Sequence, residues 1–302
     1  MDPILEQKLA SLGEHIRQRT RERQAQAQAQ AQAQTLEVPA TALVIPFSHP
    51  WAEAVRACPL AMLRSALFGV VRRGRRQHLD DVEIAAWSGI SIRYKGDRLD
   101  QADLDVWMQA VHLFRQQGLG GRLCLSAYEF LKAIERCTGK HDYQWLERSF
   151  TRMIACAVKI DTGRYRYAGN LVHEFWYDKE NEWYVLSLNP HLAALFADGY
   201  SLIEWEQRLV LGNKDLAKWL LGYVSTHQAT VLKPHRIGLD KLQRLCGAEM
   251  RDKDFKYWTR HYMDQLKDLG AVTAWHFTGA DNDILEFIRP PQKASRKSQR
   301  KR

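Results

Sequence analysis

Residues 141–157 combine an apolar helix face with side chains that can recognise the edges of DNA bases. Leu146, Phe150, Met153 and Ala157 recur at the three- and four-residue spacing of a helix that packs on a core. About half a turn away lie His141, Gln144, Arg148, Thr151 and Arg152. Glutamine can bond adenine, and arginine can bond guanine, through two hydrogen bonds at once, so we predict a DNA-contacting helix. The alternative is an ordinary solvated helix face.

The segment that follows this helix places cations beside aromatic residues. It contains Lys159, Arg164 and Arg166, with Tyr165 and Tyr167 next to the arginines. Lysine and arginine contact phosphates, and tyrosine rings can stack on bases. Because a turn signal precedes Arg164, these residues predict a β-hairpin that contacts DNA.

A second helix with a basic side is expected over residues 252–269. Its predicted core face consists of Phe255, Trp258, Tyr262, Leu266 and Leu269. The predicted DNA-contacting residues are Arg251 just before the helix and Lys253, Lys256, Arg260 and Lys267 on its opposite side. Asp264 lies near that side, so the face is basic but not uniformly so. The turn between the two strands expected after this helix contains Asp281 and Asp283. We expect this acidic hairpin tip to stay away from phosphates.

Three helices and a set of strands are expected to position the DNA-contacting face of residues 141–157. We expect helices at 97–117, 126–139 and 141–157, a brief strand at 123–125, and strands at 158–161, 165–177 and 183–188. Gly118 stops the first helix, and Ser126 with Glu129 forms a capping box for the second. Gly139 is expected to end that second helix.

The same order of elements recurs later in the chain. Helices are expected at 213–227, 239–245 and 252–269, and strands at 271–277 and 284–288. Gly247 and Gly270 close the second and third of these helices. Three helices followed by a hairpin, twice, predict an α+β fold of two tandem winged-helix domains. Any small α+β domain can show the same order, so the pattern alone leaves other folds open.

This interpretation divides the chain into four parts. Residues 1–41 form a flexible leader, because the Gln-Ala alternation from Gln24 to Gln34 has no side chain large enough to pack a core. Residues 42–205 form the first winged-helix domain, and residues 206–288 form the second. Residues 289–302 form a basic tail with seven Lys or Arg residues and no acid.

The positive charge is unevenly distributed along the sequence. The net charge is +9, and apart from the tail a second basic cluster runs from Arg56 to Arg76. Such clusters suit a polyanion such as nucleic acid. A tail that only promotes solubility is the alternative.

Composition argues against membrane and secreted classes. Of the 302 residues 45% are apolar, yet no run approaches the roughly 18 apolar residues that a membrane helix needs. Asp2 and Glu6 precede any apolar segment, unlike in a secretory signal. None of the five cysteines forms a C-x-x-C pair, which argues against a disulfide framework or a cysteine-rich zinc site. We expect a soluble, cytoplasmic protein with no membrane contact.

Motifs for enzymatic chemistry are incomplete. Gly139-Lys140 resembles the end of a phosphate-binding loop, but Ile134 stands where its first glycine is needed. His173-Glu174 begins a zinc-hydrolase motif that fails at Tyr177. A nicking replication enzyme would need two histidines around one apolar residue, and the chain has no His-x-His. We expect no enzymatic activity, no metal and no cofactor.

Four stretches in this order resemble the TrfA family of plasmid replication initiators. The first runs from Pro50-Trp51 to the segment 64–68, and the others are 192–200, 216–227 and 242–247. The similarity spans about residues 42–288. It implies two winged-helix domains that bind repeated sites, called iterons, in a plasmid origin of double-stranded DNA. It also implies opening of an AT-rich region, recruitment of the host replication initiator and replicative helicase, and a switch between dimer and monomer, without enzymatic activity.

One segment departs from the family pattern. Family members carry a glutamine-led, aromatic-ended peptide before the Pro-Trp pair, which docks on the DNA sliding clamp. Here residues 42–47 lack the glutamine, and Pro46 stands at the aromatic position. This departure argues against clamp contact by that route.

The leading hypothesis is thus a plasmid replication initiator in the bacterial cytoplasm. A winged-helix transcriptional regulator without origin function is the alternative. Direct repeats beside an AT-rich tract favour the initiator, whereas an inverted repeat, which mirrors a two-fold dimer, favours the regulator.

Overall fold

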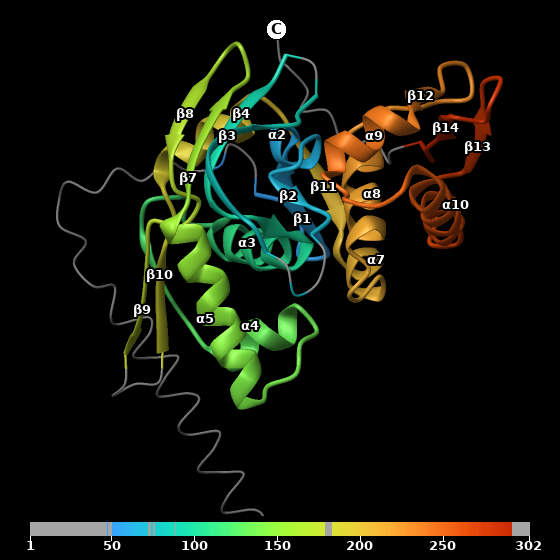
Figure 1. The fold of residues 1–302 in the computed structure, drawn as a ribbon. Helices are drawn as coiled ribbons and strands as arrows, with labels where there is room; N and C mark the ends of the chain where they lie inside the picture. Colours follow the sequence, from blue (N-terminus) through green and yellow to red (C-terminus); the bar gives the residue numbers. More distant parts are fainter. Residues whose placement is uncertain are drawn as a thin grey trace, which may run out of the picture. The chain divides into compact units, whose positions relative to one another are not determined.

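The computed structural model describes residues 47, 50–71, 74, 76–87, 89–178 and 183–291. The predicted leader, the departing segment 42–46 and the tail beyond residue 291 lie outside the described residues. Within the described part the fold mixes helices with several small sheets (Figure 1). It therefore confirms the α+β class predicted from the sequence.

The first half is organised around α3, Gln101–Phe114. Asp100 begins this helix, because its carboxylate accepts hydrogen bonds from the backbone N–H groups of Ala102 and Asp103, at 3.0 and 2.9 Å. The Asp103 carboxylate accepts from the Asp100 N–H in return, at 3.2 Å, which completes a capping box. The helix is buried along almost its whole length.

Helix α4, Ala127–Ala133, begins at Ser126 as predicted, since the Ser126 hydroxyl accepts from the Glu129 N–H at 3.4 Å. The prediction that Gly139 ends this helix is wrong. The chain leaves the helix through Glu135, which has φ +52°, and the Arg136 N–H bonds the Leu131 carbonyl at 2.9 Å. Gly139 is instead the residue at which α5, Lys140–Ala155, begins.

A three-stranded antiparallel sheet packs beside α5. It contains β6, Arg122–Leu125, β9, Glu174–Asp178, and β10, Trp183–Ser187, in the order β6-β10-β9. Val185 of β10 is paired with Cys124 on one side and with Trp176 on the other. Strand β6, which precedes α4 in the sequence, therefore pairs with β10, the last strand of this sheet in the sequence.

The prediction of one continuous strand at 165–177 is wrong. The structure has two strands there, β8, Arg166–Gly169, and β9, and they belong to different sheets. Between them Leu171 and Val172 are fully buried, and their N–H groups bond the Met153 carbonyl near the end of α5, at 3.1 and 3.2 Å. This inward step of the backbone ends the ladder of β8.

Strand β8 is the edge of a four-stranded antiparallel sheet. Its members are β3, His78–Ile84, β4, Ser91–Asp97, β7, Ala157–Asp161, and β8, in that order. Side chains of β4 alternate between buried and exposed positions, as expected for a sheet with one solvated face. The predicted basic hairpin is thus part of this separate sheet.

Short elements connect this half to the rest of the chain. They are β1, Val55–Pro59; α2, Leu60–Leu63; β2, Phe68–Gly69; β5, Leu99–Asp100; a 3-10 turn, Pro190–Leu192; α6, Ala193–Ala197; β11, Tyr200–Glu204; and α7, Trp205–Val210. Strand β1 pairs antiparallel with β11, and β2 pairs parallel with β5. The predicted domain boundary after residue 205 falls where β11 passes directly into α7.

The second half repeats the order of helices and of the three-stranded sheet in the first, without a counterpart of β7 and β8. It contains α8, Asp215–Ser225; β12, His235–Gly238; α9, Leu239–Cys246; α10, Asp252–Asp268; β13, Ala274–Thr278; and β14, Ile284–Ile288. The strand order β12-β14-β13 matches β6-β10-β9. Helix α9 ends at Gly247 with φ +65°, which confirms that prediction.

One hydrophobic core extends through both halves. Phe68 and Trp107 of the first half and Trp219, Leu242 and Phe287 of the second are all buried in it. The Trp219 indole N–H donates to the Ser65 carbonyl at 3.1 Å. The halves therefore share an apolar interface, which restrains their relative motion.

Candidate nucleic-acid interface

The exposed face of α5 is the one predicted from the sequence. Leu146, Phe150 and Met153 are fully buried. His141, Gln144, Arg148 and Thr151 are exposed on the opposite side. Among the described residues, the side chains of Gln144 and Arg148 have no hydrogen-bond or ion-pair partner, so both are available to an external ligand. The Thr151 hydroxyl instead donates to the Glu147 carbonyl of its own helix, at 2.8 Å.

Arg152, which was predicted to contact DNA with these residues, points to the interior. Its side chain is 14% exposed, and its guanidinium lies 2.5 Å from the Asp103 carboxylate of α3. The same carboxylate, which is fully buried, also accepts from Ser149 at 2.6 Å and from Arg76 at 2.8 Å. Arg152 is therefore not expected to contact DNA, because its guanidinium pairs with Asp103 and attaches α5 to α3.

The predicted basic hairpin is exposed, but its charges are locally compensated. Lys159 lies 3.6 Å from Asp81 of β3, and Arg166 lies 2.9 Å from Asp161. Asp81 also pairs with Arg93 of β4, and the hydrogen bonds from Arg93 lower the pKa of this carboxyl. The guanidinium of Arg164 stands 5.0 Å from the ring of its neighbour Tyr165.

One aromatic residue of that hairpin is not available for base stacking. Tyr167 is 4% exposed, and its hydroxyl donates to the Asn170 carbonyl. Burial raises the pKa of this phenol above its ordinary value. Tyr167 thus belongs to the core under the four-stranded sheet, and only Tyr165 remains partly accessible.

Helix α10 carries the second predicted basic side. Lys253, Arg260 and Lys267 are exposed. Lys256 donates to the Asp281 carbonyl at 2.8 Å, and the guanidinium of Arg260 stands 5.6 Å from the Phe277 ring of β13. These contacts join the basic side of the helix to the hairpin that follows it.

The N-terminus of α10 has a local ion pair. Arg251, the residue just before the helix, lies 2.7 Å from Asp254, and this pairing raises the pKa of the arginine. An ion pair between neighbours on one turn is weak because both groups remain in water. Arg251 can therefore exchange Asp254 for a phosphate at small cost.

The predicted core face of α10 needs one correction. The buried stripe is Phe255, Thr259, Met263 and Leu266, whereas Trp258 is 41% exposed. Trp258 stacks on Tyr262 at the border of the stripe, with ring centroids 5.6 Å apart. The large apolar ring of Trp258 suggested that it is buried. The helical period instead places the smaller Thr259 in the buried stripe.

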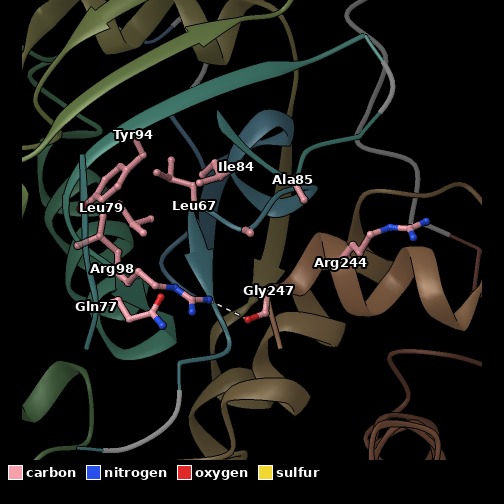
Figure 2. A pocket seen from close by; sticks show the side chains of 11 residues that line it. Leu67, Gln77, Leu79, Ile84, Ala85, Tyr94, Arg98, Arg244 and Gly247 are labelled. Atoms are coloured by element: carbon pink, nitrogen blue, oxygen red, sulfur yellow. Dashed lines mark hydrogen bonds between the residues drawn. The ribbon is translucent and has the colours of Figure 1, made fainter. Parts of the chain in front are cut away.

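A small pocket lies between the four-stranded sheet and α9 (Figure 2). It has a volume of about 180 Å³ and is lined mainly by apolar side chains such as Leu67, Leu79 and Ile84. Arg98 crosses it to donate to the Gly247 carbonyl at 2.8 Å and to pair with Glu249. Because Arg98 is bound to the second half in this way, the pocket is part of the contact between the halves.

Metal-binding clusters are absent from the described part of the chain. It contains no group of three or more His, Cys, Asp or Glu side chains that could hold a metal ion. None of its helices is both long and apolar enough to cross a membrane.

Comparison with known proteins places this arrangement in a family. Residues 8–285 match the family model described as TrfA protein, so the chain belongs to the TrfA family. A relative in Escherichia coli, the plasmid replication initiator protein TrfA, is 24% identical over 244 residues. That alignment covers 75% of this chain and 60% of the relative, so the chain spans less than two thirds of the relative's length.

Two solved structures show a distant likeness. Domains 2 and 3 of RctB superpose with a TM-score of 0.46 at 10% identity, over 68% of this chain and 84% of that one. The Pi initiator protein in complex with iteron DNA superposes with a TM-score of 0.41 at 15% identity, over 57% of this chain and 82% of that one.

Proposed function

We propose that this chain is a plasmid replication initiator that binds iterons in an origin. The observation that carries the proposal is the α5 face of a TrfA-family chain, where exposed Gln144 and Arg148 lie opposite a fully buried stripe. Both side chains match base edges in the major groove, and neither has a partner among the described residues. The curated relative carries the name of a plasmid replication initiator, which agrees with this function.

We further propose that residues 42–205 and 206–288 are two winged-helix domains. The repeated strand order, in which the short strand before the second helix pairs with the last strand of the hairpin, supports this assignment. In the first domain β9 and β10 then form the wing, and β7 and β8 are an insertion between the recognition helix and that wing. Helix α5 and helix α10 are the two recognition helices.

The two helices are proposed to contribute differently. Helix α5 contacts base edges through Gln144 and Arg148, with His141 and Thr151 beside them. Helix α10 contributes Arg260, which contacts a base edge. It also contributes Lys253 and Lys267, together with Arg251 and Lys256, which contact phosphates. Asp264 and Asp268 on the same helix are exposed, which keeps its field weaker than that of an all-basic face.

The remaining family properties are part of the same proposal. The chain would act in the bacterial cytoplasm, open an AT-rich region and recruit the host initiator and replicative helicase. It would associate with itself as a dimer, and it would not act as an enzyme. Lys159, Arg164 and Arg166 on the β7–β8 hairpin would contact phosphates only after exchanging their present acidic partners, where these exist.

A footprint of the full chain on the plasmid that encodes it tests the proposed function. We expect protection of short direct repeats beside an AT-rich tract, without ATP and without strand cleavage. Protection of only an inverted repeat at a promoter would favour the regulator instead. Magnesium-dependent nicking of supercoiled origin DNA, abolished when a tyrosine is replaced, would contradict the proposal.

A further inference from the structure

A buried group of charges joins the two halves. Asp105 of α3 accepts from Arg208 of α7 at 2.6 Å and from Lys218 of α8 at 2.5 Å. Arg208 is fully buried, and the other two side chains are 7–8% exposed. Asp105 belongs to the first half, Arg208 to the connecting helix α7, and Lys218 to the second half. A single carboxylate of α3 therefore pairs with two buried cations, one from α7 and one from α8.

Arg208 is held in one orientation by further bonds. Its second terminal nitrogen donates to both the backbone and the side-chain oxygen of Gln101, at 3.1 and 3.0 Å. Its first terminal nitrogen donates to the Lys218 carbonyl at 3.1 Å. The planar guanidinium thus connects α3, α7 and α8, and rotation of one half against the other would break several of these bonds together.

The apolar contacts between the halves do not have this directional character. Hydrophobic burial is non-directional, so an apolar interface alone tolerates small shifts. Buried ionic groups are different, because moving the halves apart would leave charges without partners in a dry interior. The two halves are therefore held in position by the Asp105 group, together with the hydrogen bonds from Trp219 to the Ser65 carbonyl and from Arg98 to the Gly247 carbonyl.

We propose that Asp105, Arg208 and Lys218 are positioning residues that set the distance between the two recognition helices, and thereby the spacing of base contacts within one DNA site. This inference rests on the proposed function. Each added base pair moves the second contact by roughly 3.4 Å and rotates it by about 35° around the duplex. A protein with a rigid connection between α5 and α10 must then reject sites with the wrong spacing.

Selection from a random pool of double-stranded DNA tests this directly with the full chain. We expect the wild type to enrich two sequence blocks at one spacing. Insertion of two base pairs between the blocks should weaken its binding at least about tenfold, since one half can then no longer reach its bases. In Asp105→Asn two buried cations lose their counter-charge, so the same blocks should be enriched at several spacings. Its insertion penalty should fall below about threefold.

Asp103→Asn is the matched control. Asp103 lies on the same helix and is also buried, but its partners Arg76, Ser149 and Arg152 all belong to the first half. This variant removes a buried carboxylate without touching the contact between the halves. It should keep the single spacing even if its overall affinity falls. A control that tolerates insertions as well as Asp105→Asn would overturn the inference.

Arg208→Lys provides a milder variant if Asp105→Asn does not fold. It keeps the charge but removes the planar fork that bonds Gln101 and the Lys218 carbonyl, so an intermediate insertion penalty is expected. Pulsed EPR without DNA gives a second measurement. Spin labels on Cys124 and on Asp268→Cys, in protein carrying Cys137→Ser, should give one narrow distance distribution that broadens in these variants.

The outcomes separate the two proposals. If the wild type enriches no sequence, the proposed function fails. If it enriches two blocks at one spacing, but the folded variants keep that spacing and a narrow distance distribution, the function stands and the positioning role is wrong. Enrichment of the two blocks at several spacings, together with a broadened distance distribution in the variants, supports the positioning role.

Discussion

Arg152 of α5 donates to the buried carboxylate of Asp103 on α3, with 2.5 Å between the nitrogen and the oxygen. The two residues are 49 positions apart in sequence. Arg152 lies at the border between the exposed side of α5, which carries Gln144 and Arg148, and the buried stripe, and its side chain reaches back to Asp103. The pair therefore adds a polar attachment between α5 and α3 to the burial of Leu146, Phe150 and Met153, which already turns Gln144 and Arg148 outward.

Arg148 and Arg152, one turn apart, should behave oppositely on substitution. Arg152→Ala should lower the free energy of unfolding by about 1.5–3 kcal/mol, because it removes charged hydrogen bonds to a buried acid. Arg148→Ala should leave stability within about 0.5 kcal/mol and cost about 1–3 kcal/mol of binding to the proposed repeat. Urea unfolding and fluorescence anisotropy measure the two quantities. Equal stability losses in both variants would refute the distinction.

Arg260 of α10 is expected to recognise a base, rather than only to attract the DNA backbone by its charge. Arg260→Ala should cost about 1–3 kcal/mol on the proposed repeat, with a smaller loss on random DNA. Lys253→Ala is the comparison, and it should weaken both DNAs by the same factor because a lysine contact to phosphate carries no sequence information. Competition binding at two salt concentrations measures both. If Arg260→Ala also weakens repeat and random DNA equally, Arg260 is only a phosphate contact.

The basic tail should add affinity without adding specificity. Removal of residues 292–302 deletes six Lys or Arg residues. Binding to specific and random DNA should weaken alike, and the log–log salt slope should fall by up to about 0.9 for each phosphate that the shortened chain no longer neutralises. Titrations across a range of salt concentrations give that slope. An unchanged slope would mean that the tail does not contact DNA.

Two stacked histidines should make stability depend on pH. His227 and His235 lie with ring centroids 3.7 Å apart at the contact between the halves. Burial, the neighbouring histidine and Arg64 lower the pKa of His227 to about 2, and burial with Arg64 lowers the pKa of His235 to about 4. Both are therefore neutral in the folded protein, and below pH 6.5 the unfolded chain binds more protons. Stability should fall as the pH decreases from about 6.5 toward 4.

The variant His227→Phe tests the predicted loss of stability at low pH. The His227 Nε2 is buried without a hydrogen-bond partner among the described residues, so a phenyl ring should be tolerated. The variant removes one titrating group, and the slope of unfolding free energy against pH should decrease by up to roughly 1.4 kcal/mol per pH unit. Urea denaturation at several pH values measures the slope. A variant whose slope equals that of the wild type would disprove the assignment.

Several features followed from the sequence because they depend on near neighbours along the chain. The exposed face of α5 could be predicted from the spacing of Leu146, Phe150 and Met153, since a helix has a constant period. The end of α9 at Gly247 could be predicted because glycine adopts a positive φ without strain. The Ser126 cap likewise depends on residues only three positions apart.

Other features depended on partners far away in sequence, and no local pattern indicated them. The charged residue Arg152 looked available until the fold placed Asp103 beside it. The basic hairpin was predicted to contact DNA through unpaired cations, but its strand β7 pairs with β4 in a sheet that also supplies Asp81 as a partner for Lys159. Trp258 looked buried because its ring is apolar, yet burial depends on what packs against the helix rather than on the side chain alone.

The sequence alone thus predicted that these helices exist, the start of α4 at Ser126, the end of α9 at Gly247, and the exposure of Gln144 and Arg148 on α5, as well as the resemblance to the TrfA family. Only the tertiary structure decided which strands share a sheet, which cations are neutralised and how Asp105 joins the two halves. The physical reason is the range of the interactions. Helical period and capping act within a few residues, whereas strand pairing and buried ion pairs need groups from distant segments to meet in one place.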